Sequence, residues 1–317
     1  GSTSTTLADY YFGAEGKVNL QAGANFATKL GGQTQVEYTV ITQLGAAGDE
    51  SRLDAVNSLQ GLGYSSRLAG KYALGWDIEN AGDTSSWNNG SGFNPIGRFS
   101  GQFEGLGHHI SGLTINRPTT LNVGLFSQLA AGSSVRNLAL QEATVVGKGI
   151  VGTLVGSSLG NIRNIFVSGT VNKGSDIHYA YGGLAGQLRD ASIEDSRAMV
   201  TVNGISEVGG LVGRLWDGTI LRSSASGDVS ATTEGSGGLV GAGRGSTTIS
   251  DSYATGNVTG QNGNGGLIGY SNTDPDSRII NSYATGSVRS TKGSAGTGFS
   301  GTGGLAALFM GTIRNSY

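Results

Sequence analysis

A motif of glycine, leucine, a small or apolar residue and glycine recurs along the last two thirds of the chain. Its clearest copies read GLAG, GLVG, GLVG and GLIG, and they begin at Gly183, Gly210, Gly238 and Gly266. With three degenerate copies included, the aligned leucines are Leu125, Leu154, Leu184, Leu211, Leu239, Leu267 and Leu305. Successive leucines are 29, 30, 27, 28, 28 and 38 residues apart, and an insertion lengthens the last interval. This period predicts one structural unit repeated along the chain.

Two further apolar patches lie in each period. The first patch, called the second motif, follows the leucine by about ten residues. It consists of an apolar residue, two mostly polar residues and usually a serine. Its isoleucines include Ile193, Ile220, Ile249 and Ile279. The other is a short valine segment such as GDV or GNV. The patches are too short for helices, and Leu, Ile and Val favour buried strands. The Gly, Asn and Asp residues between them tolerate the positive φ of tight corners.

Three short strands in 27–30 residues predict one coil of a parallel β-helix. Coils would stack at about 4.8 Å, so that equivalent residues form ladders. The repeated leucines and isoleucines would fill the interior, because one coil cannot bury its apolar face alone. A β-propeller is the alternative, but its blades usually need about 40 residues or more. We therefore predict an all-β solenoid.

The first 122 residues lack the leucine-glycine motif. Two segments within residues 17–41 alternate apolar and polar residues, as strands do. Residues 49–63 predict one short helix, through the three-residue spacing of Leu53, Val56, Leu59 and Leu62. We divide the chain into N-terminal strands and a helix at 1–70, irregular first coils at 71–122, and the repeat β-helix at 123–317. Because the chain stops inside a copy of the second motif, we expect the array to be truncated at its C-terminal end.

Composition narrows the function classes. Gly accounts for 58 of 317 residues, but hydrophobic residues make up 37%, so the glycines punctuate an ordered structure. A net charge of -2 without a Lys/Arg cluster argues against a nucleic-acid interface and a polybasic membrane patch. The sequence has no apolar run of the roughly 18 residues that a membrane span needs, so we expect no membrane insertion. Cys is 0, and we expect a monomer without a cofactor.

The unit GGLVG…ISDSYATGNV resembles the GLUG repeat of bacterial surface proteins. The preceding stretch, from YTVITQLG to GHHISGLTINRP, resembles a segment of filamentous-haemagglutinin-like exoproteins of the two-partner secretion pathway. Together the resemblances cover roughly residues 35–317. They imply a right-handed parallel β-helix, Sec export, an outer-membrane two-partner transporter as export partner, and adhesion or biofilm formation at the bacterial cell surface. GLUG repeats also occur in some IgA-cleaving metallopeptidases, but this chain lacks the HExxH motif that those enzymes need.

Aromatic residues are the main candidates for ligand binding. Tyr253, Tyr283 and Tyr317 occupy matching repeat positions, and Phe166 aligns with them. Stacked coils would turn them into an aromatic column that could pack on sugars or serve as an interface anchor. The alternative is simple ladder stacking, inward or at a corner. The other candidates are the three tryptophans, Trp76, Trp87 and Trp216.

Polar candidates are weaker. His108 and His109 are adjacent on a predicted strand, so they would point to opposite faces, and a coil corner is the simpler interpretation. Asp274 and Asp276 could offer oxygens to calcium, but their loop lacks a known calcium-binding spacing. We therefore predict no metal site and read that loop as a solvated corner.

Three further carboxylates, those of Glu194, Asp195 and Asp251, fall at comparable repeat positions and could form an acid-base pair. Because the equivalent residues in other repeats vary, a polar surface is the simpler interpretation, and no catalytic residue is assigned.

Three functions remain open. We favour a rigid β-helical stalk of a secreted adhesin that binds a glycan, an exopolysaccharide or a host surface receptor. A spacer without a ligand of its own is the alternative, which a face of only Ser, Thr and Gly would support. A polysaccharide-cleaving enzyme would require a groove that holds carboxylates and a basic residue.

Overall fold

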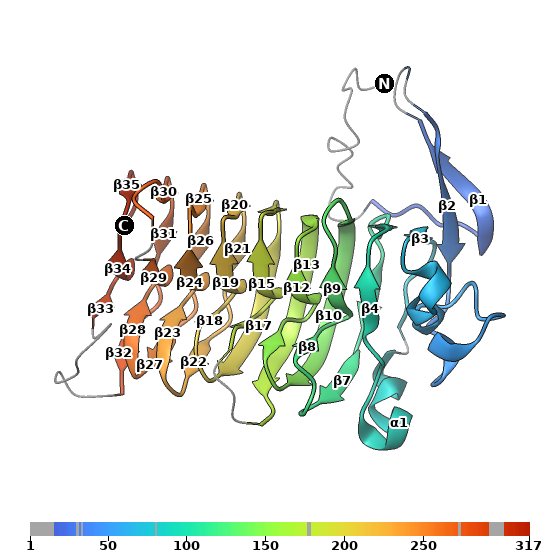
Figure 1. The fold of residues 1–317 in the computed structure, drawn as a ribbon, viewed down its shortest axis with the longest axis horizontal. Helices are drawn as coiled ribbons and strands as arrows, with labels where there is room; N and C mark the ends of the chain where they lie inside the picture. The colour runs from blue at the N-terminus through green and yellow to red at the C-terminus, as the bar shows by residue number, and fades with distance from the viewer. Residues whose placement is uncertain are drawn as a thin grey trace.

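The chain folds as a parallel β-helix whose coils stack along one long axis (Figure 1). The computed structural model describes residues 16–29, 32, 34–79, 81–175, 179–271, 274–291 and 301–317. Most of the insertion in the last repeat, residues 292–300, lies outside the described residues. The predicted all-β solenoid is confirmed, since every pairing between named strands of successive coils is parallel within the described ranges.

Three sheets run the length of the solenoid. The seven-stranded sheet contains β8 (Asn122–Val123), β11 (Ile150–Val151), β14 (Tyr181–Gly182), β18 (Val208–Gly209), β23 (Glu234–Gly237), β28 (Asn262–Gly265) and β33 (Thr302–Gly303). The eight-stranded sheet contains β4 (Ile96–Phe99), β9 (Phe126–Leu129), β12 (Val155–Ser158), β15 (Ala185–Arg189), β19 (Val212–Trp216), β24 (Val240–Arg244), β29 (Ile268–Ser271) and β34 (Ala306–Phe309).

The third sheet, called here the long sheet, has 20 strands because each coil crosses it in up to three short segments. Its early strands are β1 (Gly23–Thr28), β2 (Val36–Ile41), β3 (Lys71–Leu74), β5 (Gln102–Glu104), β6 (His109–Ser111), β7 (Thr114–Arg117), β10 (Ser134–Gly147) and β13 (Asn161–Lys173). Its later strands are β16 (Ser192–Glu194), β17 (Arg197–Gly204), β20 (Thr219–Leu221), β21 (Ser224–Ala225), β22 (Val229–Ala231), β25 (Thr248–Ser250), β26 (Tyr253–Ala254), β27 (Val258–Gly260), β30 (Arg278–Ile280), β31 (Tyr283–Ala284), β32 (Val288–Ser290) and β35 (Thr312–Arg314).

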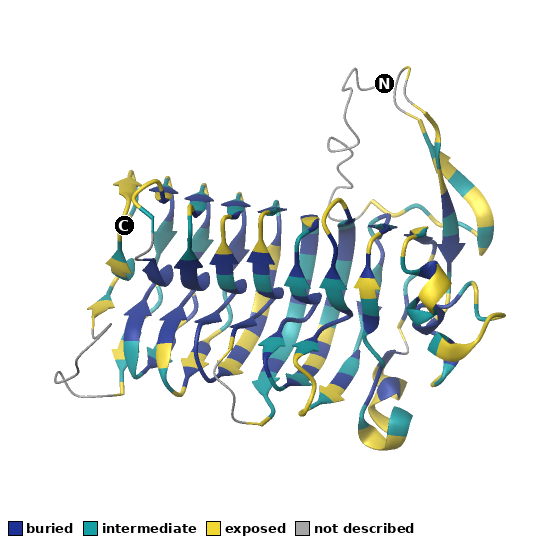
Figure 2. Cartoon of the chain, viewed as in Figure 1, coloured by how far each residue is buried: buried dark blue, intermediate teal, exposed yellow. Residues whose placement is uncertain are grey.

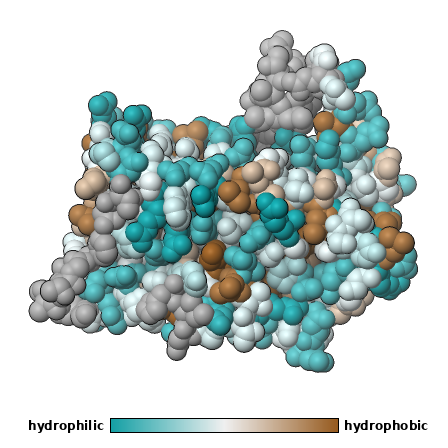
Figure 3. All heavy atoms as spheres, in the orientation of Figure 1, coloured by the Kyte–Doolittle hydropathy of each residue, from teal (hydrophilic) through white to brown (hydrophobic). Residues whose placement is uncertain are grey.

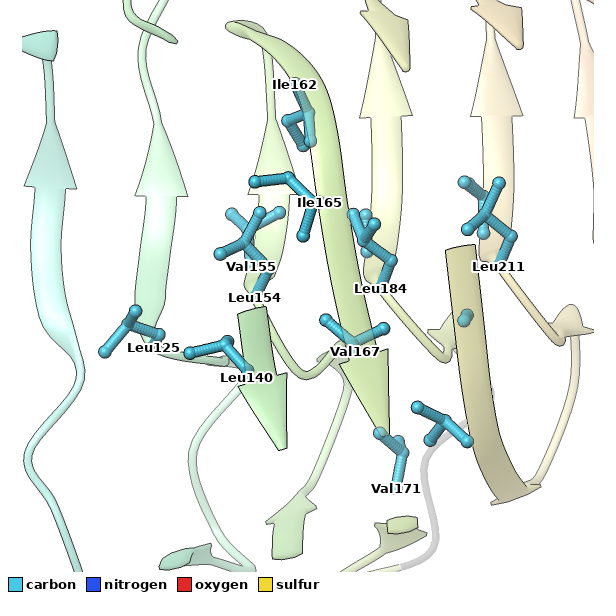
Figure 4. Close-up of a cluster of buried hydrophobic side chains, with 14 of the residues drawn as sticks. Leu125, Leu140, Leu154, Val155, Ile162, Ile165, Val167, Val171, Leu184 and Leu211 are labelled. Carbon is cyan, nitrogen blue, oxygen red and sulfur yellow. The ribbon is translucent and has the colours of Figure 1, made fainter. Parts of the chain in front are cut away.

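The core consists of ladders of like residues. The repeat leucines from Leu125 to Leu267 are 0% exposed, and four of them lie in neighbouring coils in Figure 4. The isoleucines Ile193, Ile220, Ile249 and Ile279 are direct register partners from coil to coil and are also 0% exposed. Leu305, in the last coil, is half-buried and packs against the same core. Figure 2 shows buried strand segments in every coil except the last, where exposed and half-buried residues predominate. The predicted repeat core is therefore confirmed.

A glycine precedes every repeat leucine except Leu154, which follows Thr153, and it allows the coils to approach closely. A Cβ atom built on Gly210 would lie 2.1 Å from the carbonyl oxygen of Gly238 in the next coil. Real Cβ atoms do not come this near to an oxygen, so a side chain at this position would push two coils apart. The repeated glycine therefore favours close stacking of the coils.

The N-terminal part begins with the two predicted strands. Strand β1 pairs with β2 in antiparallel orientation. Strand β2 then pairs in parallel with β3, and β3 pairs in parallel with β5. Strands β5, β6 and β7 all pair with the long strand β10, so the first coils join the repeat region without a break in the sheet. One hydrophobic cluster extends from Ile41 to Ile279.

The predicted helix over residues 49–63 is wrong. This segment forms short 3₁₀ turns at Asp49–Ser51 and Gln60–Gly63, followed by another at Ser65–Arg67. Leu53 and Val56 are 71% and 45% exposed, while Leu59 and Leu62 are buried. The Arg67 guanidinium donates hydrogen bonds to three backbone carbonyls of residues 53–61, at 2.5 to 3.0 Å. In a helix these carbonyls would accept backbone N–H hydrogen bonds. Their hydrogen bonds to Arg67 therefore compete with helix formation.

Residues 81–92 form a segment that projects from the first coils (Figure 1). It contains a 3₁₀ turn at Ala81–Ser86 and the short element α1 (Trp87–Gly90). Within α1, Asn88 and Asn89 have φ values of 51° and 57°, which is left-handed backbone that Asn tolerates better than most residues.

Candidate ligand-binding face

Each coil of the long sheet turns a corner at a single left-handed residue. These residues have φ values between 46° and 55°, and they are Asn137, Asn164, Asp195, Arg222, Asp251, Asn281 and Asn315. Asn and Asp predominate because their short polar side chains tolerate left-handed backbone. We call this set the corner column. It explains the variable polar position of the second motif.

Hydrogen bonds join the corner column from coil to coil. Asn164 Nδ2 donates to Asn137 Oδ1 at 2.7 Å, and Asn281 Nδ2 donates to Asp251 Oδ1 at 3.0 Å. Asp195 lies between two arginines, with Arg163 Nε at 3.1 Å and Arg222 Nε at 2.6 Å. The corner carboxylates are therefore engaged in ion pairs and amide contacts.

A buried serine column lies directly behind the corner column. Its members are Ser196, Ser223, Ser252 and Ser282, and the half-buried Ser316 continues it in the last coil. Each hydroxyl donates to the carbonyl two residues earlier and accepts the backbone N–H of the equivalent residue in the preceding coil, as when Ser223 Oγ accepts from Ser196 N at 3.1 Å. In the two preceding coils Leu138 and Ile165 replace serine. The serines hold the corner rigid and keep the next residue directed outward.

The residues that follow form an outward-facing row, called here the outer column. Register pairs place His109, Ala139, Phe166, Arg197, Ser224, Tyr253 and Tyr283 one above another in successive coils. Their neighbours Ile110, Leu140 and Val167 are buried, so the alternation of the strand directs the outer column away from the core. The sequence alignment of Phe166 with the tyrosines is confirmed.

The tyrosines of the outer column stack on one another. Tyr253 and Tyr283 have ring centroids 5.0 Å apart and planes within 3°, and Tyr317 continues the stack at 5.5 Å and 13°. The predicted aromatic column is present. Its ring faces cover each other, however, so the column offers hydroxyl-bearing edges to a ligand. This geometry agrees with the ladder-stacking alternative.

A groove of about 530 Å³ lies over the early part of the same face. The outer-column residues His109, Ala139, Phe166 and Arg197 run along it, and corner residues such as Asn164 line one side. Its volume is within the range of about 300–1,000 Å³ found for small-molecule sites. Phe166 is half-buried, and no aromatic partner covers its ring among the described residues. This groove is the best-formed combination of an available ring with polar groups.

An ion-pair network closes the N-terminal end of the groove. Asp77 Oδ2 contacts Lys17 Nζ at 2.7 Å, and Asp77 Oδ1 lies 3.1 Å from Nδ1 of both His108 and His109. Burial acts to raise the pKa of Asp77, but hydrogen bonds from Lys17, from the His109 backbone N–H and from His108 outweigh it and hold the pKa at about 2. The adjacent histidines, expected to face apart, thus share one carboxylate.

The groups most able to hold a metal ion are Asp77, Glu79 and His109, whose ligand atoms lie within 4.8 Å of one another. His109 Nε2 is 3.0 Å from Glu79 Oε1, while its Nδ1 faces Asp77. A single imidazole cannot direct both nitrogens at one ion. The arrangement is therefore that of a histidine hydrogen-bonded to two separate carboxylates. The prediction that the chain has no metal site stays a prediction.

The tryptophans occupy three different environments. Trp76 is 50% exposed beside β3, whereas Trp87 in α1 is half-buried and packs against the core. Trp216 is 37% exposed, and the Arg189 guanidinium lies 4.8 Å from its ring centroid. None of the three lines the groove. Their role in ligand binding stays a prediction.

The remaining polar candidates are accounted for by local contacts. Asp274 Oδ1 accepts the backbone N–H of Asp276 at 2.8 Å, as in a turn, and the Asp276 side chain is exposed. Glu194 lies 3.5 Å from the Arg222 guanidinium. Asp251 accepts from the Ser250 hydroxyl at 2.7 Å.

One buried polar cluster was missed by sequence reasoning. Glu207 is 5% exposed, and its carboxylate contacts Arg214 and, at 2.9 Å, Arg244 Nη2. The Tyr270 hydroxyl donates to Glu207 Oε1 at 3.1 Å, and burial followed by the charge of Glu207 raises the pKa of Tyr270. These residues come from three coils, so only an alignment of the repeats could have brought them together.

Comparison with known proteins agrees with the repeat. Residues 204–230 match the model of the GLUG motif. The chain carries a GLUG motif within a β-solenoid. Halomucin of Haloquadratum walsbyi is 35% identical over 214 residues, which is 65% of this chain and 2% of that protein. A protein of Evansella cellulosilytica named "Putative Gly-rich membrane protein" is 33% identical over 171 residues, 52% of this chain and 19% of that protein. The chain thus spans a small part of these relatives.

A solved structure has the same fold. A protein of Bacteroides ovatus named "putative immunoglobulin A1 protease" aligns with a TM-score of 0.59, at 21% identity, over 88% of this chain and 84% of that one. At this identity the likeness concerns the fold alone. Within the described residues, no helix is both long and apolar enough to cross a membrane.

Proposed function

We propose that this β-solenoid is part of a bacterial surface protein and binds a glycan in the groove of the long sheet. The observation that carries the proposal is the groove of about 530 Å³ beside the uncovered ring of Phe166. The C–H faces of a pyranose pack on aromatic rings, and its hydroxyls pair with amides such as those of the corner column. The same groove joins both kinds of group.

The solenoid supports binding through rigidity. Its corner and serine columns join every coil to the next, so the groove is already formed before a ligand arrives. A preformed site avoids the entropic cost of ordering loops on binding. A peptide that adds a strand would need a free sheet edge, whereas this face consists of the middle coils of a continuous sheet. A glycan therefore fits this face better than an extended peptide.

Surface display is supported by the relatives. One of them is named as a membrane protein and is 33% identical to this chain over 171 residues. Figure 3 shows a largely hydrophilic surface with small hydrophobic groups between the polar ones, as suits a rod surrounded by water. Adhesion and biofilm formation are the roles we infer for such a rod. Export through an outer-membrane two-partner transporter is a separate proposal that rests on sequence resemblance.

The test is binding of the chain to a glycan panel that includes bacterial exopolysaccharides. We expect saturable binding that Phe166→Ala abolishes. Tyr179→Ala is the matched control, because Tyr179 is an aromatic residue that is 37% exposed but lies outside the groove. Absence of binding to every glycan would favour the spacer alternative, and equal binding by the Phe166 variant would place the site elsewhere.

A further inference from the structure

The groove contains a slot between two rings. His109, Ala139 and Phe166 are consecutive members of the outer column, so a small side chain lies between two planar ones. Coils stack about 4.8 Å apart, so His109 and Phe166 are separated by about 9–10 Å. A flat ring in van der Waals contact with both sides needs about 7–8 Å. The slot above Ala139 therefore accommodates one ring of a ligand.

One uncompensated cation of the described residues lies one coil beyond the slot, on the other side of Phe166. Arg197 is the register partner of Phe166 in the next coil, and its side chain is exposed. In the described part of the chain it has no hydrogen bond or ion pair. The other charges of the groove are compensated, because Lys17 pairs with Asp77, and Asp195 pairs with Arg163 and Arg222. The groove therefore has one positive charge that an anion could neutralise.

The uncharged groups of the groove suit hydroxyls. Asn164 uses its amide nitrogen to bind Asn137, which leaves its amide oxygen as an acceptor. The Gln141 side chain also lines the groove and has no hydrogen bond among the described residues. A ligand that fits must therefore combine a flat apolar face, hydroxyl groups and one negative charge.

We propose that the slot binds a carboxylated sugar ring, that is, a uronic-acid residue of an acidic polysaccharide. The ring packs on Phe166 and the carboxylate pairs with the Arg197 guanidinium. The two oxygens of the carboxylate match the planar fork of arginine. This inference rests on the proposed function and specifies the class of glycan that the groove accepts.

The test compares oligogalacturonate with its methyl ester, which keeps the ring but lacks the charge. Calorimetry on the whole chain should show the ester binding about two- to fivefold more weakly, since an ion pair with an exposed arginine contributes up to about that factor. Arg197→Gln should reduce acid binding to the level of the ester, and Arg197→Lys should restore only part of it. Binding of the acid, but not of the ester, should weaken as salt rises.

Two controls accompany these variants. Arg289→Gln removes an exposed arginine of β32 that lies outside the groove, so it should leave binding unchanged, and circular dichroism checks that each variant is folded. Equal binding of acid and ester, unaffected by Arg197→Gln, would overturn the acidic-sugar inference. If Phe166→Ala still weakened both probes, the proposed glycan-binding function would stand. A stronger response to sulfated than to carboxylated oligosaccharides would also overturn the assignment of a carboxylate.

Discussion

Removal of one hydroxyl from the buried serine column tests how the corners are held. Ser223 is 2% exposed, and its Oγ donates to the carbonyl of Leu221 at 2.8 Å and accepts from the N–H of Ser196 at 3.1 Å. In Ser223→Ala the N–H of Ser196 loses its partner in a place that water does not reach. An unpaired buried donor costs about 1–3 kcal/mol. We therefore expect the free energy of unfolding to fall by about 2 kcal/mol.

Urea denaturation followed by circular dichroism measures the loss, and amide hydrogen exchange locates it. Because the stability of a solenoid is approximately a sum over neighbouring coils, faster exchange should be centred on the coils of Ser196 and Ser223. Ser230→Ala is the matched control, since Ser230 faces outward in β22 and is exposed. Its effect should stay within about 0.5 kcal/mol. A loss of less than about 0.5 kcal/mol in Ser223→Ala would refute the assigned role of the serine column.

Three further predictions concern the core, the coil spacing and the N-terminal network. Leu211→Ala should lower the free energy of unfolding by about 2–5 kcal/mol, measured by denaturation, because Leu211 is 0% exposed in a packed ladder. Gly210→Ala should destabilise the solenoid, whereas Gly304→Ala, at the same repeat position with no atom within 4 Å, should leave its thermal midpoint unchanged. The pKa of Asp77 falls from its ordinary value of 3.8 to about 2, so its stabilising effect is complete above about pH 4 and is lost toward pH 2. Asp77→Asn should remove that part of the acid dependence in a pH titration of stability.

Each of these has an outcome that would contradict it. Equal destabilisation by the two glycine variants would mean that backbone freedom, and not coil spacing, selects glycine. A Leu211 variant as stable as the parent would mean that the ladder collapses to fill the space. An unchanged acid dependence in the Asp77 variant would assign the pH effect to other carboxylates.

The interior of the solenoid was predictable because stacking repeats one environment. The leucine at each period meets the same neighbours above and below, so the same residue is selected in every coil, from Leu125 to Leu267. The serine of the second motif recurs for the same reason, through the hydrogen bond from the preceding coil. A period in the sequence therefore translates directly into a ladder in the structure.

The helix expected at residues 49–63 failed for the opposite reason. Its three-residue apolar spacing is a local signal, but Arg67 binds carbonyls of the segment from outside it. Likewise, the shared carboxylate of Asp77 joins histidines 31 and 32 residues later in the sequence. Such contacts are not repeated from coil to coil, so they leave no periodic pattern in the sequence.

The outer column lies between these two cases, which explains why the alignment of Phe166 was predicted from the sequence but the groove was not. Its backbone position repeats as strictly as the core, which is why Phe166 could be aligned with Tyr253 and Tyr283. Its side chains face solvent and are free to vary, so a small residue at 139 and a cation at 197 follow no pattern. The regular core fixes the spacing of about 4.8 Å between members, and the irregular side chains determine what fits between them. The binding site that we propose therefore lies where the outer column changes from one coil to the next, as it does between His109 and Arg197.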